Sequence, residues 1–202
     1  MNDRSSRSPG SNRASLFETA IESFAELGFN GASMRTVASR AGMALSNLYN
    51  YAPSKQDLLV QILRKANYDH LSATEWAMSG AGKEPADRLA AGVRAYVKYI
   101  TENTAEVLVA HTEVRYLDTE HRDRLVVARD RIDSLLRDVV EEGVSAGLFH
   151  TPRPADTTRA ILVMCAGIAR WYKPGGPLSA DEISDHYARL ALAMVEADIS
   201  HL

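Results

Sequence analysis

The stretch that decides the fold runs from residue 14 to residue 59 and reads ASLFETAIESFAELGFNGASMRTVASRAGMALSNLYNYAPSKQDLL. It opens with an apolar stripe at helical spacing, which the glycines at positions 28 and 31 end. The stripe comprises Leu16, Phe17, Ala20, Ile21, Phe24 and Leu27. Ser33 can then cap a short second helix, which Gly42 breaks. The inner face of that helix would hold Met34, Val37, Ala38 and Ala41.

A third helix is predicted at residues 45–51, so that two short helices lie about three residues apart across a glycine. This arrangement is typical of the helix-turn-helix of DNA-binding proteins. Ala38 and Gly42 are small where the helices would cross, and Leu48 would point into the core. The outward face of the third helix carries hydrogen-bonding and aromatic side chains, as expected of a surface that contacts DNA bases and phosphates. The alternative is a solvated turn between structural helices.

The candidate DNA contacts divide into two groups. Phosphate contacts position a protein on DNA, whereas contacts to base edges read the sequence. The predicted phosphate-binding residues are Arg35, Thr36, Tyr49, Tyr51 and Lys55. The predicted base-facing residues are Leu45, Ser46, Asn47 and Asn50. Of these, Asn47 or Asn50 could pair with adenine, and Leu45 or Ser46 could sense a thymine methyl group.

The same stretch, residues 14–59, resembles the DNA-binding domain of the tetracycline-repressor (TetR) family. The resemblance implies a homodimer with two reading heads on palindromic double-stranded operator DNA, a C-terminal ligand domain, and derepression by a small-molecule effector. It also implies phosphate contacts at Thr36, Tyr49, Tyr51 and Lys55. Two positions depart from the family pattern: Leu45 stands where many members have a polar residue, and Ala52 where a phenylalanine is usual.

The remainder of the chain is also predicted to be helical. Ser54 and Asp57 have capping-box spacing at the start of a long helix that should end near Gly80. Further apolar stripes occupy residues 85–101, 104–114, 119–146, 154–172 and 180–198, with no strand alternation. The sequence therefore predicts an all-α protein with a disordered arm at 1–12, a helix-turn-helix domain at 13–53 and a ligand-binding and dimerisation domain at 54–202. Arg4 and Arg7 of the arm could touch DNA or belong to an unimportant tail.

A dimer interface is predicted from the last two stripes. Residues 160–169 are apolar on every side, and a soluble helix of that kind is expected to face both a core and a partner. The predicted interface residues are Ile161, Cys165, Ile168, Ala188, Ala191, Leu192 and Val195. The alternative is a monomeric core.

An effector pocket is predicted from aromatic and soft side chains on the central helices. Its candidate residues are Trp76, Tyr96, Tyr99, His111, Tyr116, Met164 and Trp171, although each could equally be core. Residues 171–183 are similar to a TetR subgroup whose members often respond to acyl-CoA thioesters of lipid or steroid breakdown. The resemblance implies such a ligand, and Arg115, Arg170 or Lys173 could hold its phosphates.

Composition limits the other classes of function. The net charge is −3, but residues 1–65 hold eight basic and five acidic side chains, which favours an end that meets phosphates. One cysteine and no long apolar run predict a soluble cytoplasmic protein without a membrane segment. An enzyme would need a metal or nucleophile pattern, and none is present, so neither a cofactor nor a metal is predicted. A helical scaffold without DNA binding remains the alternative to a regulator.

Overall fold

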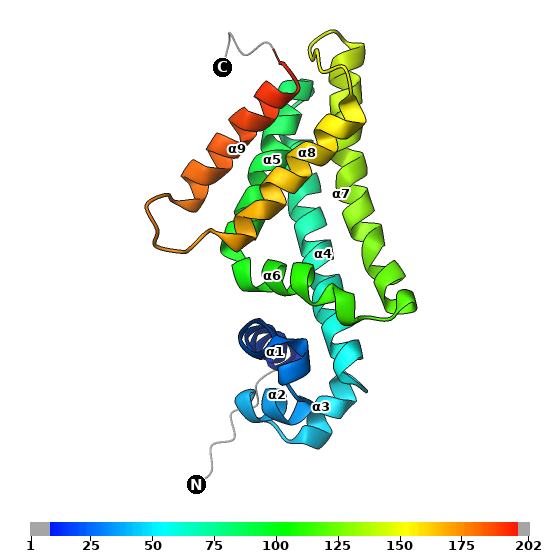
Figure 1. The fold of residues 1–202 in the computed structure, drawn as a ribbon, viewed down its shortest axis with the longest axis vertical. Coiled ribbons are helices and arrows are strands. Elements are labelled where there is room, and N and C mark those ends of the chain that lie inside the picture. The colour runs from blue at the N-terminus through cyan, green and yellow to red at the C-terminus, as the bar shows by residue number, and fades with distance from the viewer. Residues whose placement is uncertain (1–8, 198–202) are drawn as a thin grey trace.

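The computed structural model describes residues 9–197 and is helical throughout, with no strand in that range. Three helices, α1 (Pro9–Gly31), α2 (Met34–Arg40) and α3 (Leu45–Tyr51), form a small head at the lower end of Figure 1. The long helix α4 (Lys55–Gly80) runs from this head into a larger helical body. The body contains α5 (Pro85–Glu102), α6 (Thr104–Thr112), η1 (Val114–Tyr116), α7 (Thr119–Ser145), α8 (Pro154–Ala166), η2 (Gly167–Arg170) and α9 (Ala180–Met194). The predicted all-α class is confirmed.

Local sequence signals explain where the head's helices begin. The Ser33 hydroxyl accepts a hydrogen bond from the Thr36 amide at 3.0 Å and caps α2. The Ser54 hydroxyl accepts from the Asp57 amide at 3.1 Å and caps α4. The N-terminus differs from the prediction, because α1 already begins at Pro9 and so includes residues 9–12 of the expected disordered arm. Arg4 and Arg7 lie outside the described residues.

Two hydrophobic cores follow one another along the long axis. The lower core joins α1, α2 and α3 to the first half of α4, and it also takes Val109 and Ala110 from α6. The upper core joins the second half of α4 to α5, α7, α8 and α9. Because α4 and α6 contribute to both cores, a boundary at residue 54 does not separate the side chains of the head from those of the body. A shift of either helix would therefore alter the packing of both the head and the body.

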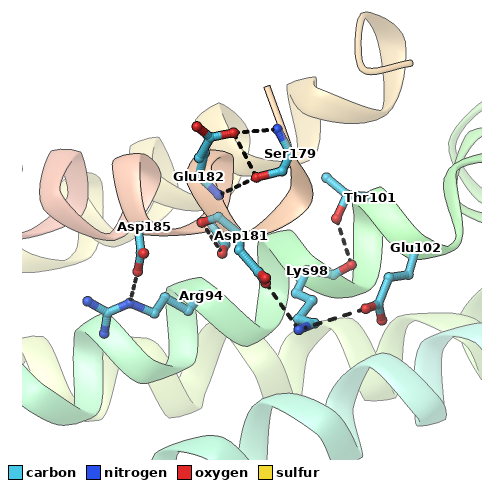
Figure 2. Close-up of polar contacts among 9 residues, drawn as sticks. Arg94, Lys98, Thr101, Glu102, Ser179, Asp181, Glu182 and Asp185 are labelled. Carbon is cyan, nitrogen blue, oxygen red and sulfur yellow. Dashed lines mark hydrogen bonds and ion pairs between the residues drawn. The ribbon is translucent and has the colours of Figure 1, made fainter. Parts of the chain in front are cut away.

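Helix α9 is fastened along α5 by packing and by ion pairs at its edge. Arg94 Nε donates to Asp185 at 2.6 Å, and Lys98 Nζ donates to Asp181 at 3.2 Å, as Figure 2 shows. The helix begins in a full capping box, in which the Ser179 amide donates to Glu182 and the Glu182 amide donates to the Ser179 hydroxyl. The ion pairs fix the position of α9 along α5, and the capping box fixes the residue at which α9 begins.

The residues predicted for the dimer interface lie in the core of the chain itself. All seven, from Ile161 and Cys165 on α8 to Leu192 and Val195 near the end of α9, are at most 3% exposed and belong to the upper core. Their side chains cannot contact a partner while the chain keeps this fold. The same helices leave other apolar side chains exposed, above all Val163 at 67% and Leu190 at 36%. Any interface on these helices therefore has to use the opposite faces.

Within residues 9–197 no helix is both long and apolar enough to cross a membrane.

Candidate nucleic-acid interface and interior cavity

The second short helix of the head presents a polar face on an apolar base. Leu48 is completely buried, whereas Ser46, Asn47, Tyr49 and Asn50 on the other sides of α3 are exposed, Tyr49 at 47%. Leu45 and Tyr51 are partly covered. This arrangement follows from helical spacing. Leu48 is the one fully buried side chain in the two turns of α3, so the other faces of this short helix are left in contact with solvent.

The turn between α2 and α3 sets the angle at which this face is presented. Gly42 has a φ of +63°, a conformation that other residues adopt only with strain. The Met43 amide donates to the Ala38 carbonyl at 3.0 Å and closes the turn. Val37 and Ala38 are buried beneath it, so the small side chain at position 38 allows the close helix crossing expected from the sequence. Ala52, which stands where a phenylalanine is usual in the family, is completely buried. The end of α3 is therefore shielded from solvent even with this smaller side chain.

The predicted DNA contacts surround α3. Asn47, Asn50 and Tyr51 line a hollow on the side of the turn. Arg35, Leu45, Tyr49 and Lys55 line a second hollow on the side of α2 and the start of α4. Thr36 is half-buried, and its hydroxyl lies 2.8 Å from the Ser33 hydroxyl. The structure thus brings together residues that the sequence spreads over 21 positions, from Arg35 to Lys55.

Lys55 has contacts that the sequence did not indicate. Its ammonium group donates to the Phe29 carbonyl at 2.5 Å and to the Ala32 carbonyl at 2.9 Å. It also lies 4.3 Å from the centre of the Phe29 ring, in a cation–π contact. Lys55 therefore fastens the connection between α1 and α2 to the start of α4, and only part of its hydrogen-bonding capacity remains for a phosphate.

A cavity of about 400 Å³ lies inside the body, where α4, α5, α6, α7 and α8 meet. It is lined by Ala66, Asn67, His70, Tyr96, Tyr99, Val107, Ala110, His111, Arg129, Asp130, Ile132, Asp133, Arg159 and Leu162. This volume falls in the range of small-molecule pockets, roughly 300–1,000 Å³. The mixture of apolar walls and a few polar groups is also typical of such pockets.

The residues predicted for the effector pocket are divided among different places. Tyr96, Tyr99 and His111 line the cavity. Trp76 is 81% exposed in a separate open groove between α4, α5 and α9. Tyr116 stacks on Phe29 at 5.6 Å in the lower core. Met164 packs against the upper core, and Trp171 is half-exposed beyond η2.

His70, which was not among the predicted pocket residues, lies at the centre of an aromatic group. Its ring stacks on Tyr99 at 4.5 Å and lies 4.1 Å from the Tyr96 ring. Its Nε2 is 3.2 Å from the Tyr96 carbonyl oxygen. Burial lowers the pKa of His70 to about 4, so the imidazole is neutral at physiological pH. Asn67 interrupts the buried apolar stripe of α4 one turn before the half-buried His70, and these two polar residues were the available signal.

Charged residues on the cavity wall come mainly from α7 and α8. Arg129 and Arg159 both line the cavity, and Arg129 donates to the Ala110 carbonyl at 3.0 Å. Burial, followed by the charges of Arg129 and Arg170, lowers the pKa of His111. The described residues contain no group of three acidic, histidine or cysteine side chains placed to hold a metal ion.

A buried carboxylate connects the cavity wall to the head. Glu113 directly follows α6 and is buried, and its Oε2 accepts a hydrogen bond from the Phe29 amide at 2.9 Å. Its other oxygen accepts from the Thr112 hydroxyl at 2.8 Å. Gln56 of α4 donates to the Tyr116 carbonyl at 3.3 Å beside it. Helix α6 therefore lines the cavity with Val107 and Ala110 and holds the head through the residue after its last turn.

A helix-turn-helix head with an exposed polar helix, joined by α4 and α6 to a body with a ligand-sized cavity, defines the class of DNA-binding transcriptional regulators. Residues 16–62 match the family model described as "Bacterial regulatory proteins, tetR family". Residues 82–195 match the model described as "Tetracyclin repressor-like, C-terminal domain". The chain belongs to the TetR family and is therefore a transcriptional regulator rather than an enzyme.

Individual relatives support this assignment along the whole chain. The transcriptional repressor KstR2 of Mycobacterium tuberculosis is 27% identical over 192 residues, which cover 94% of this chain and 96% of that repressor. The crystal structure of the TetR-family regulator PfmR of Thermus thermophilus has a TM-score of 0.82 and 29% identity, and the match covers 88% of this chain and 97% of PfmR. A structure of AibR in complex with isovaleryl coenzyme A and operator DNA shares the fold at a TM-score of 0.80 and 23% identity, over 92% of this chain and 98% of AibR.

Proposed function

We propose that this regulator is a repressor that binds a palindromic operator as a homodimer and leaves it when a small molecule fills the interior cavity. The observation that carries the proposal is the exposed face of α3, where Ser46, Asn47, Tyr49 and Asn50 surround the buried Leu48. That face offers the donors and acceptors that base edges and phosphates require. The 27% identical relative is named a transcriptional repressor, which supports repression rather than activation.

Release by an effector fits the way the cavity and the head share structural elements. The cavity is walled by α4 and α6, and both helices also enter the core of the head. An effector shifts an equilibrium only by its difference in affinity between two states, so it must prefer the state in which the heads are misplaced. Two recognition helices have to lie about 34–36 Å apart to reach successive major grooves. A small displacement of α4 or α6 in each subunit would disturb that spacing.

For the effector itself we propose an acyl-CoA thioester. The cavity has apolar walls for an acyl chain, and Arg129 and Arg159 lie on its lining, where they could meet phosphates. Of the basic residues expected for this role, Arg170 lies close enough to His111 to lower the pKa of that histidine. Arg115 instead lies over the Tyr116 ring at 4.9 Å. In AibR, which shares the fold, the bound molecule is isovaleryl coenzyme A.

Operator binding is the first test. Purified protein is titrated into labelled DNA from upstream of its own gene, and anisotropy is followed at about 50 and 200 mM salt. We expect tight binding that outcompetes random DNA and falls steeply with salt, because phosphate contacts release counterions. Binding that ignores sequence, both here and in a genome-wide selection, would favour the alternative of a helical scaffold without a working head.

The effector part of the proposal has its own test. Acyl-CoA thioesters added to the preformed complex should weaken operator binding, and operator DNA should weaken thioester binding by the same factor. If both ligands bind together without weakening each other, induction by these ligands is excluded.

A further inference from the structure

The inner wall of the cavity holds polar groups that no described residue satisfies. The Tyr96 hydroxyl has no hydrogen-bond partner among the described residues, and neither has Nδ1 of His70. Neither atom is sealed in the protein interior, because the one sealed and unpartnered side-chain atom in the described part of the chain is Nε of Arg137. Both residues line the cavity, which is the open space beside them.

The chemistry of these two atoms is complementary. The Tyr96 carbonyl can only accept, so Nε2 of His70 carries the proton that it shares with that oxygen. A neutral imidazole then has a bare Nδ1, which is an acceptor. The Tyr96 hydroxyl is protonated, because burial raises its pKa, and it can donate. Asn67, one turn before His70, donates to the Leu125 carbonyl at 3.2 Å and leaves its own oxygen as a second acceptor.

The side chains of this part of the wall are themselves neutral, and the charge on the cavity lining that acts on both His70 and Tyr96 is that of Arg129. The aromatic group of His70, Tyr96 and Tyr99 comes from α4 and α5, whereas the charged lining residues come from α7 and α8. His70 and Tyr96 offer one acceptor and one donor, so this wall favours a ligand group that can both donate and accept a hydrogen bond. A purely hydrocarbon group would leave an acceptor and a donor unsatisfied, which also costs free energy.

We propose that the effector carries an uncharged hydroxyl group at its buried end, which donates to Nδ1 of His70 and accepts from the Tyr96 hydroxyl. This inference rests on the proposed function in taking the cavity as the effector site. A ketone could accept from Tyr96 but would leave the acceptor of His70 without a partner. A carboxylate would face the His70 acceptor with a second acceptor and could not donate to it. Of these groups, the hydroxyl is the one that both donates and accepts, so it can satisfy both atoms at once.

Direct binding without DNA tests the hydroxyl site. The probes are coenzyme A thioesters of straight-chain acids from hexanoic to dodecanoic acid, compared at each length with the ω-hydroxy acid and the ω-carboxy acid. Calorimetry gives the affinity of each thioester for the full-length protein. At the length that places the end group beside His70, the hydroxy thioester should bind about tenfold more tightly than the unsubstituted one, since two buried hydrogen bonds are gained.

Two variants locate the preference at the proposed atoms. Tyr96→Phe removes the donor and keeps the ring, and His70→Phe removes the acceptor and keeps an aromatic ring beside Tyr99. Each should reduce the preference for the hydroxy thioester over the unsubstituted one to about threefold or less, whatever its effect on the affinity that the two thioesters share. Tyr68→Phe, on the exposed side of α4, is the matched control and should retain the full preference. Thermal unfolding of each variant verifies that it folds.

The possible outcomes separate the two proposals. Equal affinities at every chain length, tighter binding of the carboxy thioester, or a hydroxyl preference that survives Tyr96→Phe would each overturn the hydroxyl site. Failure of all the thioesters to bind would overturn it together with the acyl-CoA proposal. Operator binding is measured on the same protein, so a regulator with a different effector would still be recognised.

Discussion

At the scale of single residues, Asn47 and Tyr49 are expected to affect DNA binding in different ways. Asn47→Ala should relax the preference at one base position by about 1–3 kcal/mol, because a bidentate contact to a base edge is lost. Tyr49→Phe removes one hydroxyl from an exposed ring and should weaken binding to all sequences alike. Competition between the operator and single-base variants measures both effects. Equal losses on every sequence for both substitutions would refute the division.

Lys55 complicates a comparison with these two residues. Its ammonium group holds the carbonyls of Phe29 and Ala32, so Lys55→Ala would alter the connection between α1 and α2 as well as any phosphate contact. Asn47 and Tyr49 have exposed side chains and provide the cleaner test.

The depressed pKa of His70 predicts a specific pH dependence of stability. Its pKa is about 4 in the folded chain and near 6.5 when unfolded, so between these values the unfolded state binds more protons. The stabilisation is complete above pH 6.5 and is lost as the pH falls towards 4. From pH 7 to pH 5 the folded state should lose about 2 kcal/mol from this residue. Urea unfolding at a fixed protein concentration measures the loss.

The matched variants for this prediction are His70→Gln and His186→Gln. His70→Gln should remove the pH-dependent loss attributed to His70, whereas His186→Gln changes an exposed residue of α9 and should retain it. An unchanged difference between pH 7 and pH 5 in His70→Gln would mean that other groups cause the pH dependence.

At the scale of elements, the end of α6 is expected to be held by a single carboxylate. Glu113→Ala would leave the Phe29 amide without its partner inside the protein, at a cost of about 1–3 kcal/mol in the free energy of unfolding. Hydrogen exchange of the Phe29 amide should accelerate as well. Glu22→Ala removes an exposed glutamate of α1 and serves as the control. Protection of the Phe29 amide that persists in Glu113→Ala would show that α6 is fixed to the head by other contacts.

The end of α7 depends on the glycine at position 143. A Cβ atom at Gly143 would overlap the Phe149 ring, which is completely covered. Gly143→Ala should therefore destabilise the chain by about 1–3 kcal/mol through overpacking. Gly80→Ala, at the end of α4, meets nothing within 4 Å and should be neutral or slightly stabilising. Thermal unfolding compares the two, and a neutral Gly143→Ala would mean that Phe149 moves aside easily.

The helices could be predicted from residues close together in the sequence, whereas the residues that line the cavity are decided by how the helices pack. The bounds of α3 and the caps of α2 and α4 follow from residues within one turn, so the sequence located them. The start of α1 was missed because residues 9–12 lack an apolar pattern. Trp76 and Tyr116 were grouped with Tyr96 by residue type alone, but helix packing places Trp76 in an open groove and Tyr116 against the lower core. A list of aromatic residues cannot say which of them share a cavity.

At the scale of the whole molecule, the proposed dimer reveals a limit of apolar patterning. The pattern identified the helices that carry apolar side chains on several faces, but it could not distinguish the face against the chain's own core from the face left for a partner. Ile161 and Ala188 take the first role, and Val163 and Leu190 are left for the second. An interface on these helices stays a prediction, and its residues have to be sought on the exposed side.

The exposed face of α8, with Val163 at its surface, is expected to take part in dimer formation. If two copies pair through α8 and α9, Val163→Asp places a charge in a desolvated contact and should convert the dimer into a monomer. Affinity for a palindromic operator should then fall about a hundredfold or more, because each head binds its half-site without help from the other. Val127→Asp alters a valine of α7 with a similar exposure, 61% against 67%, and should leave both properties unchanged. Sedimentation and operator titration measure the two effects, and a Val163→Asp protein that stays dimeric would move the interface away from this face of α8.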